Sequence, residues 1–473
     1  MIASVTELWP YGAAILSLAV SLAASYHIIV LRKGNLRSAI GWIGVVWLSP
    51  YLGTLLYFVF GINRIRRRAS RLRSSWPRLR FDAQAADPPD LEPRGLASLV
   101  GRVTGLPLLP GNRIRPLING EEAYPAMLEA IRGAEHSIGL ATYIFDNDPA
   151  GRMFAEALGD AVRRGVEVRV LIDSVGSRYT IPSIFSELAR HGVRAEEFLH
   201  SFIPWRMSYL NLRCHRKIMV VDGRVGFTGG MNIRDGHQSQ HDLRRGIADT
   251  QFKVEGPVVE HLARVFADDW AFTTGETLSG DKWFPKLEPV GDAHARGVPG
   301  GPDEDFEKLR FVMTAALAAA RQSVRIVTPY FLPDDVMITA LNLAAMRGIP
   351  VDIVIPARGN LRLVEWASRA QLDLVIRRGC RVWCSPAPFD HSKLFVVDDC
   401  WAFIGSANWD PRSLFLNFEF NLECYGADLA RQLARIVDHK IARSTPLTLE
   451  QLQARSRWAK LRDGMARLIS PYL

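Results

Sequence analysis

The sequence predicts an α/β protein built from two similar halves, with a membrane-inserting segment in front of them. Three observations support this prediction. Short β-branched runs alternate with amphipathic stretches from about residue 110 onward, this order repeats once, and two long uncharged runs precede it. A chain of 473 residues is also too long for one ordinary core, so two or three domains are expected.

The clearest sign of duplication is a pair of matching strings. CHRKIMVVDGRVGFTGGMN begins at Cys214, and DHSKLFVVDDCWAFIGSAN begins at Asp390. The shared residues are His215, Lys217, Asp222, Gly229 and Asn232 in the first string and His391, Lys393, Asp398, Gly405 and Asn408 in the second. Corresponding members are 176 residues apart, as His391 is from His215. Such a constant offset indicates that a whole structural unit is repeated.

The surrounding pattern repeats as well, and it divides the chain. Strand–helix–strand elements are expected at 137–145, 150–165 and 166–173, and again at 323–331, 334–348 and 349–357. The Pro/Gly-rich stretch ARGVPGGPDED is expected to be a linker. The predicted segments are a membrane hairpin with a basic segment (1–73), a connector (74–109), a first half (110–294), a linker (295–305), a second half (306–445) and a basic C-terminal helix (446–473). The last helix is expected either on the bilayer surface or packed on the second half.

Two uncharged runs near the N-terminal end predict a transmembrane hairpin. Trp9–Leu31 and Ile40–Ile62 are each long enough to span a bilayer. A cleaved signal peptide fits less well, because no basic residue precedes the first run and a second run follows it. The turn between the runs carries three basic residues, and NRIRRRASRLR after the second run carries six. This bias predicts a multi-pass membrane protein with its large C-terminal part on the cytoplasmic side.

The overall charge predicts an anionic partner. The formal net charge is +9, which suits either nucleic acid or anionic lipid. Much of the excess lies beside the uncharged runs, which favours the lipid bilayer, and no nucleic acid partner is expected. The five cysteines form no CxxC pair, and Cys380 and Cys384 with His391 lack a second ligand pair at zinc-like spacing. No metal or other cofactor is therefore expected, and the oligomeric state stays open.

The repeated residues suit phosphoryl chemistry. Alternation along a strand puts a His and the Lys two residues later on one face. A neutral His can act as nucleophile, acid or base, while Lys and Asn can bind phosphate oxygens. Two facing sets would allow one His to attack phosphorus and the other to protonate the leaving alkoxide. Asp222 and Asp398 belong to the same sets but stand at strand ends, where Asp stabilises turns, so they are interpreted as scaffolding of the site.

The sequence resembles the phospholipase D superfamily, and within it the bacterial cardiolipin synthases. The resemblance covers nearly the whole chain, through the paired H-x-K-x4-D motifs, the two-run N-terminus with WLSPYLGTLLYFVFG, and GSANWDPRSLFLNFE. It implies tandem phospholipase D-like halves and condensation of two phosphatidylglycerol molecules into cardiolipin plus glycerol, without metal or nucleotide. The implied roles are nucleophile and acid/base for His215 and His391, with the former as nucleophile, phosphate binding for Lys217, Lys393, Asn232 and Asn408, and orientation of the histidines for Asp249 and Glu419.

Some positions depart from the family pattern, and other functions stay open. Gly230 stands where the second motif has Ser406, Gln251 stands where relatives often have His, and GHQSQHD replaces a more apolar phrase. These changes put the acceptor in doubt rather than the chemistry. His237 and His241 in that loop are expected to be solvent-exposed. The alternatives are phospholipase D-type hydrolysis of a lipid or nucleic acid, transfer to another lipid alcohol, and a non-catalytic membrane scaffold, which two intact motif sets disfavour.

Overall fold

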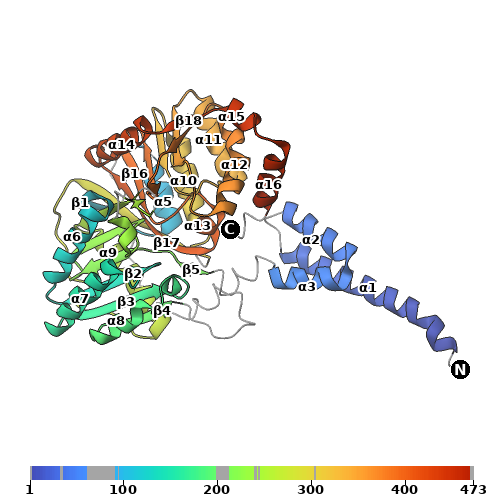
Figure 1. Cartoon of the computed structure of the whole chain (residues 1–473), viewed down its shortest axis with the longest axis horizontal. Coiled ribbons are helices and arrows are strands. Elements are labelled where there is room, and N and C mark those ends of the chain that lie inside the picture. The colour runs from blue at the N-terminus through green and yellow to red at the C-terminus, as the bar shows by residue number, and fades with distance from the viewer. Residues whose placement is uncertain are drawn as a thin grey trace. The chain divides into compact units, whose positions relative to one another are not determined.

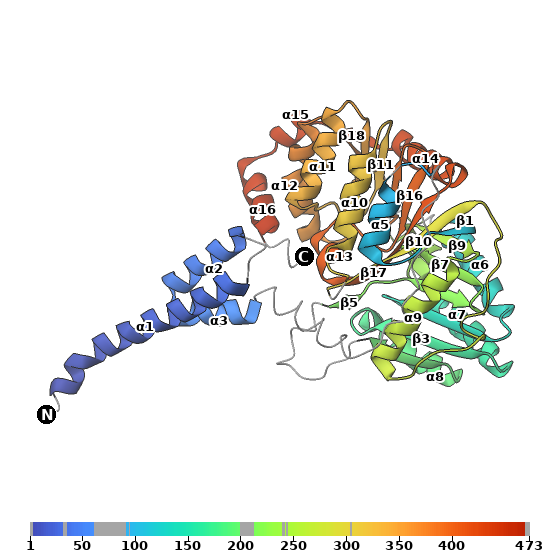
Figure 2. The same cartoon turned by 180° about the vertical axis from the view of Figure 1, so that it is seen from behind.

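Figures 1 and 2 show the structure of the chain, a computed structural model. It describes residues 3–31, 36–60, 91–93, 95–198, 212–238, 242, 245–302 and 305–468. These residues form two compact units, Met1–Ser74 and Ser75–Leu473, and each is described by itself.

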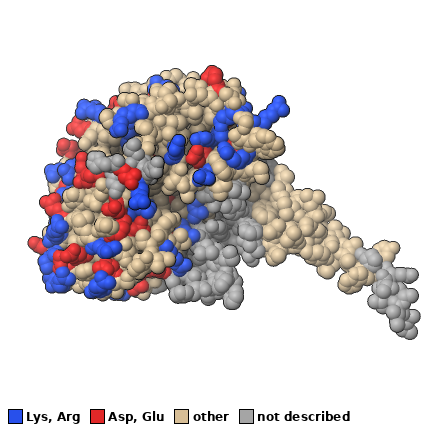
Figure 3. Space-filling model, viewed as in Figure 1, with Lys and Arg blue, Asp and Glu red and all other residues tan. Residues whose placement is uncertain are grey.

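The N-terminal unit contains three apolar helices, α1 (Ala3–Leu31), α2 (Leu36–Leu48) and α3 (Pro50–Phe60). Tyr11–Val30 within α1 is long and apolar enough to cross a membrane, and it is the one such segment in the described part of the chain. The second predicted span, 40–62, is instead broken between α2 and α3. Pro50 lacks an N–H and favours the first position of a new helix, which explains the break. In Figure 3, the described part of this unit shows no Lys, Arg, Asp or Glu side chain on the visible face.

The first half of the large unit alternates strands and helices as predicted. Its elements are α5 (Leu96–Thr104), β1 (Leu109–Ile118), α6 (Asn119–Arg132), β2 (Ser137–Thr142), α7 (Pro149–Arg163), β3 (Glu167–Asp173), α8 (Ile184–Arg190), β4 (Arg194–Phe198), β5 (Arg213–Cys214), β6 (Ile218–Val221), β7 (Val225–Gly229), β8 (Ile247–Ala248), β9 (Thr250–Glu255) and α9 (Val259–Thr274). Two short 3-10 turns, Gly176–Arg178 and Asp235–His237, lie between these elements.

The second half repeats this order. Its elements are β10 (Ala293–Gly300), α10 (Lys308–Ala319), β11 (Val324–Val327), α11 (Asp335–Met346), β12 (Val351–Pro356), α12 (Arg362–Ile376), β13 (Arg381–Ser385), β14 (Phe389–Asp390), β15 (Leu394–Val397), β16 (Trp401–Gly405), α13 (Pro411–Phe415), β17 (Asn417–Tyr425), α14 (Ala427–Ala442), β18 (Thr445–Leu447), α15 (Leu449–Gln453) and α16 (Arg457–Leu468).

Both halves join in one continuous sheet. Its order is β18-β13-β12-β11-β15-β16-β17-β10-β1-β9-β7-β6-β2-β3-β4, with β5 beside β17. Strands β1 and β10 meet antiparallel at the centre, where Leu109 pairs with Ala295. Reading outward from this contact, the two halves have the same strand order, as a pseudo-twofold axis requires. Each half has its own buried apolar core, and the tandem α/β prediction is confirmed.

The predicted linker at 295–305 is wrong, because most of it forms the central strand β10. Strand β10 pairs with β1 only near its start, so at Pro299 it pairs with β17 alone. Proline is tolerated there because its missing N–H faces the unpaired side of the strand. Gly297 allows the strand to pack against Phe420, whose ring would lie 3.0 Å from an added Cβ. The Pro and Gly content that suggested a loop therefore reflects an open strand edge and close packing.

The predicted connector at 74–109 also requires correction in its described part. Residues 96–104 form helix α5, and Leu96, Ala97 and Val100 are buried in the core of the second half. The buried Arg296 of β10 fixes this helix by donating to the carbonyl of Ala97 at 2.8 Å. The segment is thus part of the catalytic fold. Residues 74–90 lie outside the described chain.

The predicted C-terminal helix, 446–473, is divided into β18, α15 and α16. Helix α16 packs on α12, where the guanidinium of Arg462 lies 4.3 Å from the ring centre of Trp366 and Ala466 is buried. An apolar stripe on α16 remains exposed, namely Trp458, Leu461, Met465 and Leu468. The helix therefore packs on the second half. Contact of its exposed stripe with a bilayer stays a prediction.

The Asp of each repeated motif closes a turn. The Asp222 carboxylate accepts hydrogen bonds from the backbone N–H groups of Glu135, His136 and Ser137, at 2.7–3.0 Å. In the second half, Asp398 accepts from the backbone of Arg321, Gln322 and Ser323 at 2.7–2.9 Å. Both residues have a left-handed φ, 51° and 54°, which Asp tolerates better than most side chains. This geometry matches the interpretation of the two residues as scaffolding.

Asp222→Ala should therefore lower stability rather than remove chemistry. Three backbone N–H groups lose their acceptor, so we expect a loss of about 2 kcal/mol in the free energy of unfolding. Denaturant unfolding and turnover per folded molecule would be measured, with the exposed Asp281→Ala as control. Unchanged stability together with lost turnover would mean that Asp222 takes part in the reaction.

Candidate active site

The two motif sets meet at one cavity between the halves. His215 and Lys217 directly precede β6, and His391 and Lys393 directly precede β15, so equivalent strands present them. All four side chains are buried. Both histidines, together with Asn232 and Asn408, line a cavity of about 560 Å³. The structure therefore brings together residues from strings that are 176 positions apart.

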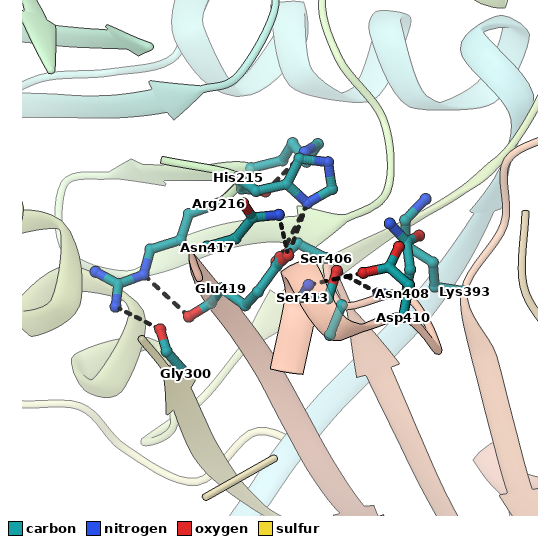
Figure 4. Close-up of polar contacts among 12 residues, drawn as sticks. His215, Arg216, Gly300, Lys393, Ser406, Asn408, Asp410, Ser413, Asn417 and Glu419 are labelled. Carbon is teal, nitrogen blue, oxygen red and sulfur yellow. Dashed lines mark hydrogen bonds and ion pairs between the residues drawn. The ribbon is translucent and has the colours of Figure 1, made fainter. Parts of the chain in front are cut away.

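Each histidine is held by a carboxylate from the opposite half. The Nδ1 atom of His215 lies 3.0 Å from both carboxylate oxygens of Glu419 on β17 (Figure 4). The Nδ1 atom of His391 lies 2.8 Å from Oδ2 of Asp249, just before β9. Both carboxylates are fully buried, at 0% and 1% exposure. The two acids predicted from the sequence do lie behind the histidines, in a crossed arrangement.

Backbone pairing fixes these crossed contacts. The N–H of His215 donates to the carbonyl of Phe418 at 2.9 Å, and the N–H of His391 donates to the carbonyl of Ala248 at 2.7 Å. Strands β5 and β17 pair in parallel, as do β8 and β14, and each pair joins the two halves. Neither half alone can complete the surroundings of its own histidine.

The two carboxylates have different neighbours, which explains one departure from symmetry. Ser406 donates to Glu419 at 2.5 Å, and Asn417 donates to the same carboxylate at 3.2 Å (Figure 4). Gly230 replaces the serine beside Asp249. An added Cβ at Gly230 would lie 2.6 Å from Oδ1 of Asp249 and 2.9 Å from Nζ of Lys393, so a side chain there would displace one of these two groups.

Burial shifts the titration of the whole cluster. It lowers the pKa of both His215 and His391, and the nearby lysines lower it further. Burial also lowers the pKa of Lys217 to about 7 and that of Lys393 to about 8, and raises that of Glu419 to about 7. An anion in the cavity would stabilise the charged lysines, because it restores the opposite charge that burial removes.

The two asparagines and Gln251 shape the turns beside the histidines. Asn232 accepts from the backbone N–H of Ile144 at 3.1 Å, and the backbone N–H of Asn408 donates to Ser413 at 3.0 Å. Gln251 accepts from the backbone N–H of Met231 at 3.3 Å. It thus supports the turn of the first motif, as Asn421 does at Ala407 in the second half.

Further residues of the cavity lie outside the motifs. They are Arg213, Arg234, Arg412, Tyr143, Tyr179, Tyr330 and His237. Arg213 could have been found from its position two residues before His215, which puts it on the same strand face. The prediction that His237 is solvent-exposed is wrong, since it is 1% exposed. His241 lies outside the described residues.

The arrangement supplies two neutral imidazoles to one cationic cavity. A carboxylate at Nδ1 accepts a hydrogen bond from Nδ1–H and so favours the tautomer in which Nε2 has a lone pair for attack on phosphorus or for proton transfer. The described part of the chain contains no group of His, Cys, Asp and Glu side chains arranged to bind a metal ion. The residues present are suited to nucleophilic substitution at a phosphodiester.

Comparison with known proteins agrees with this geometry. Residues 127–270 and 313–441 match the family described as "Cardiolipin synthase, PLD-like domain", and residues 19–61 match "Phospholipase_D-nuclease N-terminal". The chain is 32% identical to the cardiolipin synthase of Geobacillus thermodenitrificans over 97% of its own length and 94% of that protein. It is 31% identical to cardiolipin synthase 2 of Bacillus anthracis, over 94% and 89%.

A solved structure shares the fold. The phosphatidylserine synthase of Haemophilus influenzae superimposes with a TM-score of 0.63 at 14% identity, over 80% of this chain and all of that one. This likeness supports the tandem architecture, whereas the relatives of higher identity extend through the N-terminal unit as well. Since these relatives match along nearly its whole length and the domain description covers both halves, the chain belongs to the phospholipase D-like cardiolipin synthase family.

Proposed function

We propose that the protein is a membrane-bound phosphatidyltransferase that condenses two phosphatidylglycerol molecules into cardiolipin and glycerol. The observation that carries this proposal is the cavity that holds both histidines, each with a carboxylate from the opposite half. The family to which the chain belongs supports the reaction, because its relatives along the whole chain are cardiolipin synthases. The substrate is a phospholipid, and phosphatidylglycerol is its proposed identity.

The first step forms a phosphatidyl-histidine. Nε2 of His215 attacks the phosphorus of one phosphatidylglycerol, and the bond from phosphorus to the headgroup glycerol oxygen breaks. The phosphate anion bound beside His391 favours the protonated form of this ring, which takes up a proton from solvent as the substrate binds and gives it to that oxygen, so glycerol leaves neutral. Lys217, Lys393, Asn232 and Asn408 would bind the phosphate oxygens, where charge is concentrated as the bond forms.

The second step reverses these roles. His391 is now neutral and removes a proton from a glycerol hydroxyl of a second phosphatidylglycerol. That oxygen attacks phosphorus, the bond to His215 breaks, and cardiolipin is released. Glu419 and Asp249 would stabilise the imidazolium forms and hold each ring in the reactive tautomer.

We also propose that the catalytic unit works at the cytoplasmic face of the bacterial cell membrane. The segment NRIRRRASRLR, which follows the apolar helices, contains six arginines, and positive charge is enriched on that side. The exposed stripe Trp458, Leu461, Met465 and Leu468 on α16 is suited to contact with acyl chains. The catalytic unit can lie on the cytoplasmic side whether the N-terminal unit crosses the bilayer twice, as the sequence predicts, or only once.

Added glycerol distinguishes transfer from hydrolysis. Transfer exchanges one phosphodiester for another, so the reaction should reverse when glycerol is abundant. We expect high glycerol to suppress cardiolipin formation from labelled phosphatidylglycerol and to regenerate phosphatidylglycerol from cardiolipin, as measured by lipid mass spectrometry. Phosphatidic acid as the sole product at every glycerol concentration would replace the proposal with hydrolysis, and dimeric products with another headgroup would change the acceptor.

The crossed pairs predict different kinetic defects for the two acids. With phosphatidyl-p-nitrophenol as donor, the leaving group needs no proton, so formation of the adduct depends on His215 and its partner. Asp249→Asn should retain a burst of p-nitrophenol and accumulate adduct on His215, whereas Glu419→Gln should lose most of the burst. Acid-quenched peptide mapping would identify the modified histidine.

An exposed acid provides the control for these variants. Asp438→Asn on α14 changes one carboxylate away from both histidines and should behave as the wild type. A burst that is lost in Asp249→Asn and kept in Glu419→Gln would reverse the assignment of nucleophile. An adduct on neither histidine would exclude the covalent mechanism.

A further inference from the structure

His237 is a third histidine of the active-site cavity, and the mechanism above gives it no role. It closes the 3-10 turn Asp235–His237, is 1% exposed and lines the cavity with His215 and His391. Among the described residues, neither of its ring nitrogens has a hydrogen-bond partner. Its ring lies beside that of Tyr124, with ring centres 6.5 Å apart. A buried imidazole without a partner is costly unless a ligand completes its hydrogen bonds.

The second half has a different residue at the corresponding place. The offset that relates the two motifs puts Ser413 opposite His237. Ser413 is used internally, since its hydroxyl accepts from the N–H of Asn408 at 3.0 Å and its own N–H donates to Asp410 at 2.7 Å. The catalytic residues are thus duplicated, but the cavity wall around them is not, so the two sides of the cavity suit different ligands.

The surroundings place His237 on the side of His391. The 3-10 turn that contains His237 contacts strand β8, which pairs with β14 directly before His391. Asp249, His391 and Lys393 also act on His237 electrostatically. Burial lowers the pKa of His237 to about 3, so its ring is neutral at physiological pH. A neutral imidazole offers one donor and one acceptor, which match an alcohol hydroxyl better than a phosphate.

We propose that His237 binds the second hydroxyl of the glycerol headgroup whose reacting oxygen exchanges its proton with His391. This inference rests on the proposed function. By microscopic reversibility, the leaving glycerol and the glycerol of the incoming phosphatidylglycerol occupy the same place beside His391. His237 is accordingly a positioning residue that selects polyhydric alcohols as acceptors over water and simple alcohols.

Acceptor competition tests this role. The full-length enzyme would be given phosphatidylglycerol together with deuterated glycerol and ethanol, and mass spectrometry would give the ratio of deuterated phosphatidylglycerol to phosphatidylethanol. Ethanol lacks a second hydroxyl, so His237→Phe should lower this ratio about fivefold, the effect of one lost hydrogen bond. His237→Gln keeps a donor and an acceptor and should retain most of the preference.

The same assay separates this inference from the function on which it rests. Wild-type enzyme that makes neither transfer product nor cardiolipin would refute the proposed function. Wild-type transfer with an unchanged product ratio in both His237→Phe and His237→Gln would overturn the role of His237 alone. A purely structural role would lower both products together, since it would not distinguish one alcohol from the other. Arg264→Gln, on the surface of α9, is the matched control.

A second inference concerns the N-terminal unit, where α2 and α3 fold back on each other. The ring centres of Trp42 and Tyr57 lie 5.6 Å apart, although a straight helix would separate them by about 22 Å. The OH of Tyr57 lies 3.0 Å from Nδ1 of His27, and the OH of Tyr51 lies 3.1 Å from Oγ of Ser17. Helix α3 therefore runs parallel to α1, and α2 runs antiparallel to it.

Several polar groups near the turn form hydrogen bonds within the unit. Nε1 of Trp47 donates to Ser25 at 3.1 Å, and Ser21 donates to the carbonyl of Val46 at 3.5 Å, near the end of α2. Ser17, Ser21 and Ser25 recur at every fourth residue and so form one face of α1 toward the turn. Gly53 permits the tight bend, since an added Cβ would lie 2.3 Å from the carbonyl oxygen of Val45. Broken helices at membrane depth require this kind of internal satisfaction.

The lengths of α2 and α3 and the positions of the basic residues agree with a helix pair that enters the bilayer only part of the way. Helices α2 and α3 are about 20 and 17 Å long, short of the roughly 30 Å hydrocarbon core. All basic residues up to position 73 follow α1, namely Arg32, Lys33, Arg37, Arg64, Arg66, Arg67, Arg68, Arg71 and Arg73. Two full spans would put the first three of these on the opposite side from the other six. A fold-back puts all nine on one side.

We infer that α1 crosses the bilayer once, whereas α2 and α3 enter it from the cytoplasmic side and return to that side. The exposed apolar side chains of this pair, such as Leu48, Leu52 and Leu55, would face acyl chains. The residues that precede α1 then lie outside the cytoplasm. This arrangement keeps the catalytic unit and every basic residue of the segment at the same face.

Cysteine labelling of the full-length protein decides between the two topologies. Ser4→Cys, Gly34→Cys and Ser74→Cys would be made with the two partly exposed native cysteines, Cys384 and Cys400, changed to Ser. A membrane-impermeant maleimide should label positions 34 and 74 from the cytoplasmic side in inverted vesicles, and position 4 in right-side-out vesicles. Labelling after solubilisation controls for the presence of each variant. Position 34 labelled from the side opposite to both position 4 and position 74 would establish two full spans, and all three positions on one side would exclude any crossing.

Discussion

The active site depends on the exchange of carboxylates between the halves. Glu419 holds His215 and Asp249 holds His391, each through Nδ1 and from the opposite side of the pseudo-twofold. Strands β9 and β17, which carry or follow these acids, lie next to the central β1–β10 pair of the sheet. The continuous sheet is therefore needed for the chemistry, because separation of the halves would leave each imidazole without its acceptor.

The same burial that fixes the histidines also sets their charge. Two lysines and two histidines share a small buried volume with two carboxylates, so burial lowers the pKa values of the bases and raises those of the acids. Such a cluster is electrostatically incomplete without a phosphate, which would restore the charged form of the lysines. Neutral imidazoles in the empty site are also the nucleophilic form. Burial of the cluster thus both favours binding of a phosphate and keeps the histidines in their nucleophilic form.

Duplication explains the reactive groups but not the choice of substrate. A side chain at position 230 would displace Asp249 or Lys393, whereas the second half has Ser406 at the equivalent position. His237 and Ser413 differ in the same way. His237 lines the cavity and has no hydrogen-bond partner among the described residues, whereas Ser413 is bonded within its turn. The phosphatidyl donor and the alcohol acceptor react at the same pair of histidines. The protein can therefore distinguish these two substrates only at positions where the two halves differ.

Local patterns determined much of the fold. The alternation of strands with amphipathic helices, and the offset between His215 and His391, depend on neighbouring residues and therefore predicted the tandem α/β halves and the residues of the site. Where the sequence failed, a distant contact overrides the local signal. Pro299 and its neighbouring glycines suggested a linker, yet β10 lies at the centre of the sheet because its pairing leaves an open edge there.

Tertiary contacts decided the remainder. Helix α5 is part of the second core because Arg296 binds it, and His237 is buried because Tyr124 and the cavity wall enclose it. The apolar run 40–62 had the length of a membrane span, but the contacts of Trp42, Tyr51 and Tyr57 fold it back. Composition alone determined that this segment is apolar and that two His–Lys sets exist. Which carboxylate serves which histidine, and how far each helix reaches, depended on contacts between residues distant in the chain, which periodicity does not record.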